Sequence, residues 1–328
     1  MKILLALVAN YLQVKTRIAS LLAVCATALL AGSCSNQDTL SLTFTEQQAA
    51  QNFSLEKIYF FNDTLGLAMG GDDYQYGIAQ YTDDGGLSWS LDTVSQKIVH
   101  DFDVVQDAIF GTGIDSYISQ KQGLASWIER RPPIWKSTNG IIKTNTGFIL
   151  AGGIAIKEGS LTILSDDLQI VDTLSFPGEI NAIARSRQSH FHLAGYGQLY
   201  RSDDAGITWQ VNAQEGDNYR NIFFINEQVG WVVGDAGSIL KTENGGLDWE
   251  ILNKPRVHNK AQFSAVHFHS ELDGIAVGRN GLVWITDDGG SNWSVVEDVP
   301  AYNYTSVFMQ MDIAWLCTDN GHIIRLFL

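Results

Sequence analysis

Pairs of adjacent carboxylates recur in this chain. Such pairs could support acid and base chemistry or hold a cation. The pairs Asp83-Asp84, Asp203-Asp204 and Asp287-Asp288 each precede a tryptophan by a few residues. Two carboxylates can serve as acid and base on a glycosidic bond, but such a pair must converge on one substrate. The runs also lack the terminal glutamate of a calcium-binding loop. We therefore expect no catalytic residue, metal or cofactor at these pairs, and a structural role in turns.

The carboxylates belong to an internal repeat. Four segments share a pattern of polar residues, glycines and a final tryptophan: Tyr81–Trp89, Arg201–Trp209, Lys241–Trp249 and Ile285–Trp293. A period of about 40 to 45 residues with glycine turns is typical of β-propeller blades, and the first interval equals about three such periods. The spacing predicts a propeller whose second and third blades have lost the pattern.

The repeated segments resemble the BNR or Asp-box motif. Side-chain oxygens at its first two positions can accept turn N–H bonds, glycine supplies a positive φ, and tryptophan fills the space between blades. The third copy departs from the motif at Asn244 and Asp248, and the fourth at Asn292. The predicted structural box residues are Thr82, Asp84, Gly86, Trp89, Ser202, Asp204, Gly206, Trp209, Thr242, Asn244, Gly246, Trp249, Thr286, Asp288, Gly290 and Trp293.

Between the boxes, short runs rich in β-branched and aromatic residues alternate with Gly, Asn and Asp, which indicates antiparallel meanders of four strands. Six such units are complete, and the C-terminal unit has three strands. The alternating run Leu40–Thr45 can supply its missing outer strand. The sequence thus predicts an all-β fold over residues 39–328, a seven-bladed β-propeller with four-stranded antiparallel blades, closed by an N-terminal strand that joins the last blade.

The N-terminus has the features of an export signal over residues 1–33, with Lys15 and Arg17 before an apolar run. Ala31-Gly32-Ser33 followed by Cys34 resembles a bacterial lipoprotein box, which implies lipidation of Cys34 and a tether over residues 34–38. The same small residues also suit ordinary secretion. We expect an exported protein of the bacterial cell envelope, lipid-anchored at Cys34 and otherwise without membrane contact.

The composition narrows the partners. The formal net charge of −15 disfavours nucleic acid. Another envelope protein or a glycan is the expected partner of a monomer. The specific surface should consist of the turns between second and third strands and the connections between blades, where aromatic and arginine side chains gather. The candidates are Asp72, Tyr74, Tyr76, Arg130, Arg131, Tyr196, Arg220, Arg256, Arg279, Asn280, Tyr304 and Asp319.

Two histidine pairs, His190 with His192 and His267 with His269, lie two residues apart in strand-like runs, so each pair points to one face of its strand. A metal site would need a third ligand from another blade. His192 aligns with Trp231 and Ile275 of the next two units, which favours a packed histidine over a ligand.

The run from Phe223 to Trp249 is similar to the repeat of the photosynthesis system II assembly and stability factor family. This resemblance implies a seven-bladed, non-catalytic scaffold that binds proteins. The alternative is a glycan-active propeller enzyme, or a glycan-binding module. The chain lacks the Arg-Ile-Pro segment that sialidases share, and no pair stands out by spacing among the acids left for a glycoside hydrolase: Asp72, Asp73, Glu158, Asp235 and Asp319.

Overall fold

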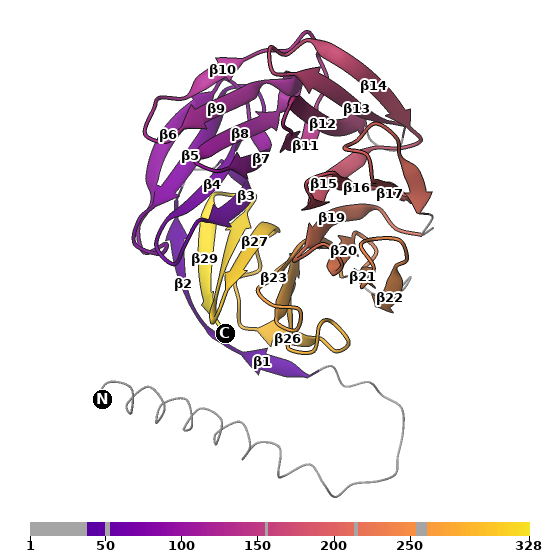
Figure 1. Ribbon diagram of the computed structural model, residues 1–328. Coiled ribbons are helices and arrows are strands. Elements are labelled where there is room, and N and C mark those ends of the chain that lie inside the picture. The colour runs from indigo at the N-terminus through magenta and orange to yellow at the C-terminus, as the bar shows by residue number, and fades with distance from the viewer. Residues whose placement is uncertain (1–37, 50–52, 155–156, 213–215, 254–260) are drawn as a thin grey trace, which may run out of the picture. The chain divides into compact units, whose positions relative to one another are not determined.

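The computed structural model describes residues 38–49, 53–154, 157–212, 216–253 and 261–328. Residues 38–328 form seven sheets around a central axis, which confirms the predicted seven-bladed β-propeller (Figure 1). The expected signal peptide, Cys34 and the tether up to Gln37 lie outside the described residues. Within the described ranges, no helix is long and apolar enough to cross a membrane.

Each blade places its first strand at the centre and its fourth strand at the rim. The first strands of blades 1 to 7 are β3 (Ser54–Phe60), β7 (Val99–Val105), β11 (Thr138–Lys143), β15 (Ile180–Arg187), β19 (Tyr219–Phe224), β23 (Phe263–Phe268) and β27 (Tyr304–Gln310). The second strands are β4 (Gly66–Asp72), β8 (Ala108–Gly113), β12 (Gly147–Ile154), β16 (His190–Gly195), β20 (Gly230–Gly234), β24 (Gly274–Gly278) and β28 (Ile313–Thr318).

The third strands are β5 (Tyr76–Thr82), β9 (Ile118–Gln122), β13 (Glu158–Ser165), β17 (Leu199–Ser202), β21 (Ile239–Thr242), β25 (Val283–Thr286) and β29 (His322–Phe327). The fourth strands are β6 (Ser90–Ser95), β10 (Ile128–Arg130), β14 (Ile170–Phe176), β18 (Gln210–Asn212), β22 (Glu250–Asn253), β26 (Ser294–Glu297) and β2 (Thr43–Gln48). A short 3-10 turn, η1 (Ile114–Ser116), separates β8 from β9. Because the strands alternate in direction, the second-to-third turns and the connections between blades share one face, the loop face. The other turns, including the boxes, lie on the opposite box face.

The N-terminal strand closes the ring, as predicted, but it is divided between two blades. β2 pairs antiparallel with β29 as the outer strand of blade 7, whereas β1 (Thr39–Ser41) pairs in parallel with β26 of blade 6. Leu42 separates the two strands, where the sequence had indicated one strand over Leu40–Thr45. The segment therefore holds the last two blades together as well as completing the final sheet (Figure 1).

The hydrophobic core lies between blades. The described residues form seven clusters, and each draws its members from two neighbouring blades around the complete circle. Second strands such as Gly230–Gly234 are buried along their whole length because neighbouring blades cover both of their faces. This arrangement explains why these strands are rich in small and apolar residues.

The boxes make the predicted turn contacts. In the first copy, the Asp84 carboxylate accepts hydrogen bonds from the N–H and hydroxyl of Ser88 at 2.9 and 2.6 Å, and the Gly86 N–H donates to the Thr82 hydroxyl at 2.8 Å. The Ser88 hydrogen bonds, with that of Thr82, lower the pKa of Asp84 to about 2. Each box tryptophan packs in the cluster shared with the preceding blade: Trp89, Trp209, Trp249 and Trp293.

The departures from the box motif preserve its hydrogen bonds. In the third copy, Asn244 Nδ2 donates to the Asp248 carboxylate at 3.0 Å, so donor and acceptor have changed places relative to Asp204 and Thr208. In the fourth copy, Asn292 Nδ2 donates to Asp288 at 2.7 Å in place of a hydroxyl. All four boxes therefore keep the same turn.

Candidate functional site

The first strands surround a central channel of about 800 Å³. Each of these strands contains a β-bulge near its loop-face end. A bulge points an extra residue away from the ladder, and all seven bulged residues are polar and line the channel. This channel ring consists of Glu56, His100, Asn139, Asn181, Arg220, Ser264 and Thr305.

Four members of the channel ring fasten one blade to the next. His100 Nδ1 lies 3.0 Å from the carbonyl oxygen of Thr138, and the side chains of Asn139 and Asn181 donate to the carbonyls of Ile180 and Tyr219 at 3.0 and 2.8 Å. Thr305 donates in the same way to the carbonyl of Leu55. Each accepting carbonyl belongs to the residue just before the next bulge, so these contacts form a belt around the channel mouth.

The belt is interrupted at blades 5 and 6 and, beyond the contact of Thr305 in blade 7 with blade 1, again at blade 1. Arg220, Ser264 and Glu56 make no hydrogen bond to the corresponding carbonyl of the following blade among the described residues. Arg220 instead lies 3.8 Å from Asp235 and 3.4 Å from the Asn181 side chain. Blades 5 and 6 therefore form the wider gap in the belt, where the ring side chains do not bond to the following blade.

Arg279 stands beside this gap, in the β24–β25 turn, and is exposed at the channel mouth. No carboxylate among the described residues pairs with its guanidinium within 4.0 Å. Asp319 also lines the channel, but it accepts a hydrogen bond from Asn303 at 2.8 Å. Arg220 and Arg279 thus place two cations from neighbouring blades at the mouth of a chain with net charge −15. Guanidinium groups in this position suit a carboxylate of a ligand.

Deeper in the channel, the charged groups neutralise one another. Arg185 of blade 4 lies 3.1 Å from Asp103 of blade 2 and donates to the Lys143 carbonyl of blade 3 at 2.5 Å. Burial raises the pKa of Asp103, and the charge of Arg185 opposes that rise. Asp101 pairs with Lys57 and accepts the Ile141 N–H at 2.9 Å. These acids join blades and are not free for catalysis.

The opposite wall of the channel is aromatic. The His267 ring lies between Phe223 and Phe308, with centroids 4.4 and 4.5 Å away, and Tyr59 continues the arc from Phe308 at 5.3 Å. His267 Nδ1 accepts the N–H of Met309, and burial lowers the pKa of His267 to about 3. The ring is therefore a neutral packing group at neutral pH.

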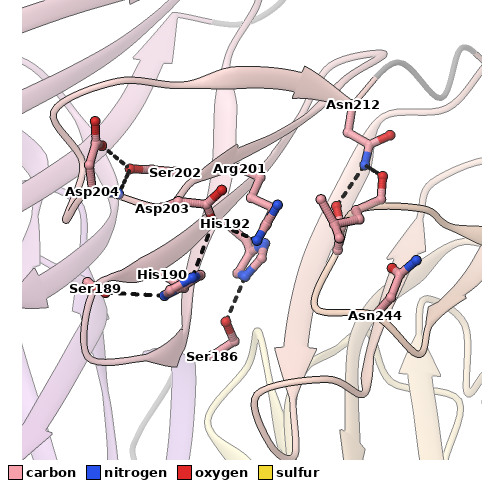
Figure 2. A network of polar contacts seen from close by, with 12 residues as sticks. Ser186, Ser189, His190, His192, Arg201, Ser202, Asp203, Asp204, Asn212 and Asn244 are labelled. Atoms are coloured by element: carbon pink, nitrogen blue, oxygen red, sulfur yellow. Dashed lines mark hydrogen bonds and ion pairs between the residues drawn. The ribbon is translucent and has the colours of Figure 1, made fainter.

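The other histidine pair lies on the box face of blade 4 (Figure 2). His192 is 1% exposed, stacks on Phe224 with centroids 4.1 Å apart, and its Nε2 lies 2.8 Å from the Ser186 hydroxyl. Burial, with the charges of Arg201 and His190, lowers its pKa to about 3. It occupies the place that Trp231 takes in blade 5, which agrees with the packed role predicted from the alignment of the repeats.

His190 is partly exposed and lies 3.2 Å from the hydroxyl of Ser189 and 3.4 Å from Asp203 (Figure 2). Arg201 binds the same carboxylate at 2.6 Å. The adjoining hollow is only about 60 Å³, far below the several hundred Å³ of an ordinary ligand pocket. No group of three or more His, Cys, Asp or Glu side chains that could hold a metal ion occurs in the part of the chain that the structure describes.

The structure separates the candidates chosen from the sequence. Arg220, Arg279 and Asp319 line the channel, and Asn280 is exposed next to Arg279, where its N–H donates to Asn303 at 3.2 Å. Tyr196 is 48% exposed at the β16–β17 turn. Asp72, Tyr74, Tyr76 and Arg131 lie on the loop face over blades 1 and 2.

The side chains of two candidates are not available to a partner on the loop face. Tyr304 is completely buried, because its ring packs in the cluster between blades 6 and 7, and its hydroxyl donates to the Pro300 carbonyl at 2.7 Å. Arg130 donates to the Asp166 carbonyl at 2.9 Å and is thereby held by the β13–β14 turn. Arg256 lies outside the described residues.

The sequence reasoning missed most of the channel ring, including Glu56, His100, Asn139 and Ser264. A signal was present, because one polar residue stands near the start of every first strand. Aligning all seven first strands would have exposed this column. Two of the acids considered for an enzyme are engaged in other contacts: Glu158 pairs with Lys136 at 3.3 Å, and Asp235 accepts a hydrogen bond from Asn218 at 2.8 Å.

Comparisons with known proteins agree with the resemblance seen in the sequence. Residues 214–326 match the model of the family described as photosynthesis system II assembly factor YCF48, and residues 80–91 and 200–211 match the BNR/Asp-box repeat. The chain is thus similar to that family over its last blades. None of the curated proteins compared matches this chain.

Solved structures share the fold at low identity. The structure described as YCF48 bound to D1 peptide is 15% identical, with a TM-score of 0.66 over 89% of this chain and 100% of that chain. YCF48 from Cyanidioschyzon merolae is 13% identical, with a TM-score of 0.63 over 86% of this chain and 98% of that one. The Pan2 WD40 domain of Neurospora crassa is 12% identical, with a TM-score of 0.65 over 84% and 89%.

Proposed function

We propose that this protein is a non-catalytic binding or assembly scaffold that takes an acidic or C-terminal peptide segment of a protein partner at the loop-face mouth of its channel. The observation that carries the proposal is the interrupted belt. Four ring side chains are used to join blades, whereas the gap presents Arg220 and Arg279. These two cations would pair with the partner's carboxylate.

The channel also supports a peptide ligand by its dimensions. The channel volume of about 800 Å³ lies within the range of ordinary ligand sites. The similar YCF48 propeller is described as bound to D1 peptide, which supports a protein partner in general terms. A propeller that uses its mouth in this way needs no catalytic group.

Charge reversal at Arg220 and Arg279 tests this function. We expect the double variant Arg220→Glu, Arg279→Glu to lose, by at least about tenfold, the proteins that the wild-type chain captures from an extract of its source cells, since each reversal replaces attraction to a carboxylate by repulsion. Captured proteins are quantified by mass spectrometry. Arg187→Glu is the matched control, because Arg187 is 57% exposed but borders the box-face hollow.

Partners that bind all three chains equally would contradict the mouth as the binding site. Hydrolysis of an envelope glycan by the purified protein, abolished by a single acid substitution such as Asp319→Asn, would contradict the non-catalytic scaffold.

For the location of the protein, the proposal includes export to the cell envelope and lipidation at Cys34. The support is the apolar run before Ala31-Gly32-Ser33-Cys34. We expect the mature N-terminus to be Cys34 carrying a diacylglyceryl group, and Cys34→Ala to abolish acylation. Intact-mass spectrometry of the protein isolated from membranes checks this. A mature chain beginning elsewhere, without added lipid, would establish simple secretion instead.

A further inference from the structure

Exposed aromatic side chains gather on a part of the loop face away from Arg220 and Arg279. Tyr74 and Tyr76, at the β4–β5 turn, are 74% and 49% exposed, and Trp135, in the connection from blade 2 to blade 3, is 71% exposed. Large apolar groups are costly to leave in water, and their concentration on one part of a surface marks an interaction site. We call Tyr74, Tyr117, Arg131 and Trp135 the aromatic patch.

The patch is held in place by its own contacts. The Arg131 guanidinium stacks on Trp135 at 3.1 Å from the ring centroid, lies 4.8 Å from the centroid of Tyr117, and donates to the Tyr117 hydroxyl at 3.0 Å. The Lys97 ammonium lies 5.7 Å above the Tyr74 ring. Aromatic groups fixed by cation–π contacts lose little freedom on binding.

The charges of the patch are also paired. Asp115 bonds to Lys97 and lies 3.8 Å from Arg131, and Lys136 pairs with Glu158 at 3.3 Å beside Trp135. Sugar recognition draws on charged groups that can bond to hydroxyls, and here the charged groups already pair with one another. An uncharged apolar segment suits this surface, since it leaves these pairs intact.

We infer that the aromatic patch is a second contact site, which binds an uncharged segment of a protein partner through apolar, aromatic or proline side chains. Tyr, Trp and Arg are the residues that most often dominate protein interfaces. The inference rests on the proposed protein-binding function and adds a site with different chemistry. Binding at the arginines of the mouth weakens as salt rises, whereas binding at the patch persists.

A random peptide library displayed on phage tests the patch and does not require the partner to be identified first. Selection on the purified protein at high salt should enrich uncharged peptides rich in apolar or proline residues. Trp135→Ala should weaken their binding about 30-fold, as for a strong interface residue. Leu124→Ala is the matched control, since Leu124 is fully exposed outside the patch. The Arg220→Glu, Arg279→Glu variant should bind these peptides normally.

The other outcomes separate the two proposals. Peptides that bind Trp135→Ala as tightly as wild type would overturn the patch and leave the mouth untouched. Peptides that fail to bind only the Arg220→Glu, Arg279→Glu variant would also overturn the patch and leave the mouth untouched. A library that yields no binder under any salt condition would contradict both sites. Binding of soluble oligosaccharides that Trp135→Ala abolishes would assign the patch to a glycan and overturn the inference.

Discussion

A chain that begins at Ala49 is expected to be less stable by at least about 4 kcal/mol than one that begins at Asp38, and to aggregate. β2 pairs with β29 over six residue pairs, from Thr43 with Phe327 to Gln48 with His322, and each ladder hydrogen bond contributes about 1 kcal/mol. Its removal also exposes the edge of β29 to other chains. Urea unfolding and size-exclusion chromatography measure both effects.

A chain that begins at Thr43 provides the intermediate case. It lacks β1 but keeps β2, the packing of Phe44 in the core and the 2.6 Å pair of Glu46 with His322. We expect it to keep the oligomeric state of the chain that begins at Asp38, with a small loss of stability, because β1 contributes only three residue pairs with blade 6. Equal stability of all three chains would show that closure of the ring does not depend on the N-terminal strand.

Acidification is expected to destabilise the protein from about pH 6.5 downwards. Burial lowers the pKa of both His192 and His267 to about 3, whereas an unfolded histidine titrates near 6.5. The unfolded chain therefore takes up these protons first, and the stabilisation present above pH 6.5 is lost as the pH falls towards 3. Each histidine should contribute a slope of about 1.4 kcal/mol per pH unit in that window. Urea unfolding at pH 6.5, 5.5 and 4.5 measures it.

Substitution separates the two histidines. His192→Phe keeps a ring against Phe224 and removes one titrating group, so the slope should fall by about half, even though the bond to Ser186 is lost. Leu124→Ala is the control, because Leu124 is fully exposed and its substitution should leave the slope unchanged. An unchanged slope for His192→Phe would contradict the assignment of this acid sensitivity to His192.

The blade count was predictable because it depends on local chemistry that repeats. The turn of a box requires glycine, a hydroxyl and a carboxylate or amide at fixed offsets, as in Thr82, Asp84 and Gly86. In blades whose box is lost, the alternation of strand runs with turn residues still allows the blade to be counted. The division of Leu40–Thr45 between two sheets was not predictable, because parallel pairing of β1 with blade 6 involves residues far apart in the chain.

The candidate site was only partly predictable. Exposed loop residues such as Arg279 and Tyr74 follow from their position in turns. Tyr304 misled the prediction because it begins a strand whose bulge turns the next residue, Thr305, into the channel and leaves the tyrosine in the core. Whether a polar ring side chain bonds to the following blade depends on that blade: Asn181 donates to the Tyr219 carbonyl, whereas Arg220 turns back to Asp235 and Asn181.

By itself the sequence determined the fold class, the number of blades, the structural role of the boxes and the N-terminal closure, because each is written in short-range patterns of strand and turn residues. The tertiary structure alone decided which side chains are available. Ring closure brings residues near positions 56, 220, 264 and 305 to one mouth, and it sets which of them bond to a neighbouring blade. That selection, made by contacts between distant parts of the chain, places the arginines of the mouth on one side of the loop face and the aromatic patch on another.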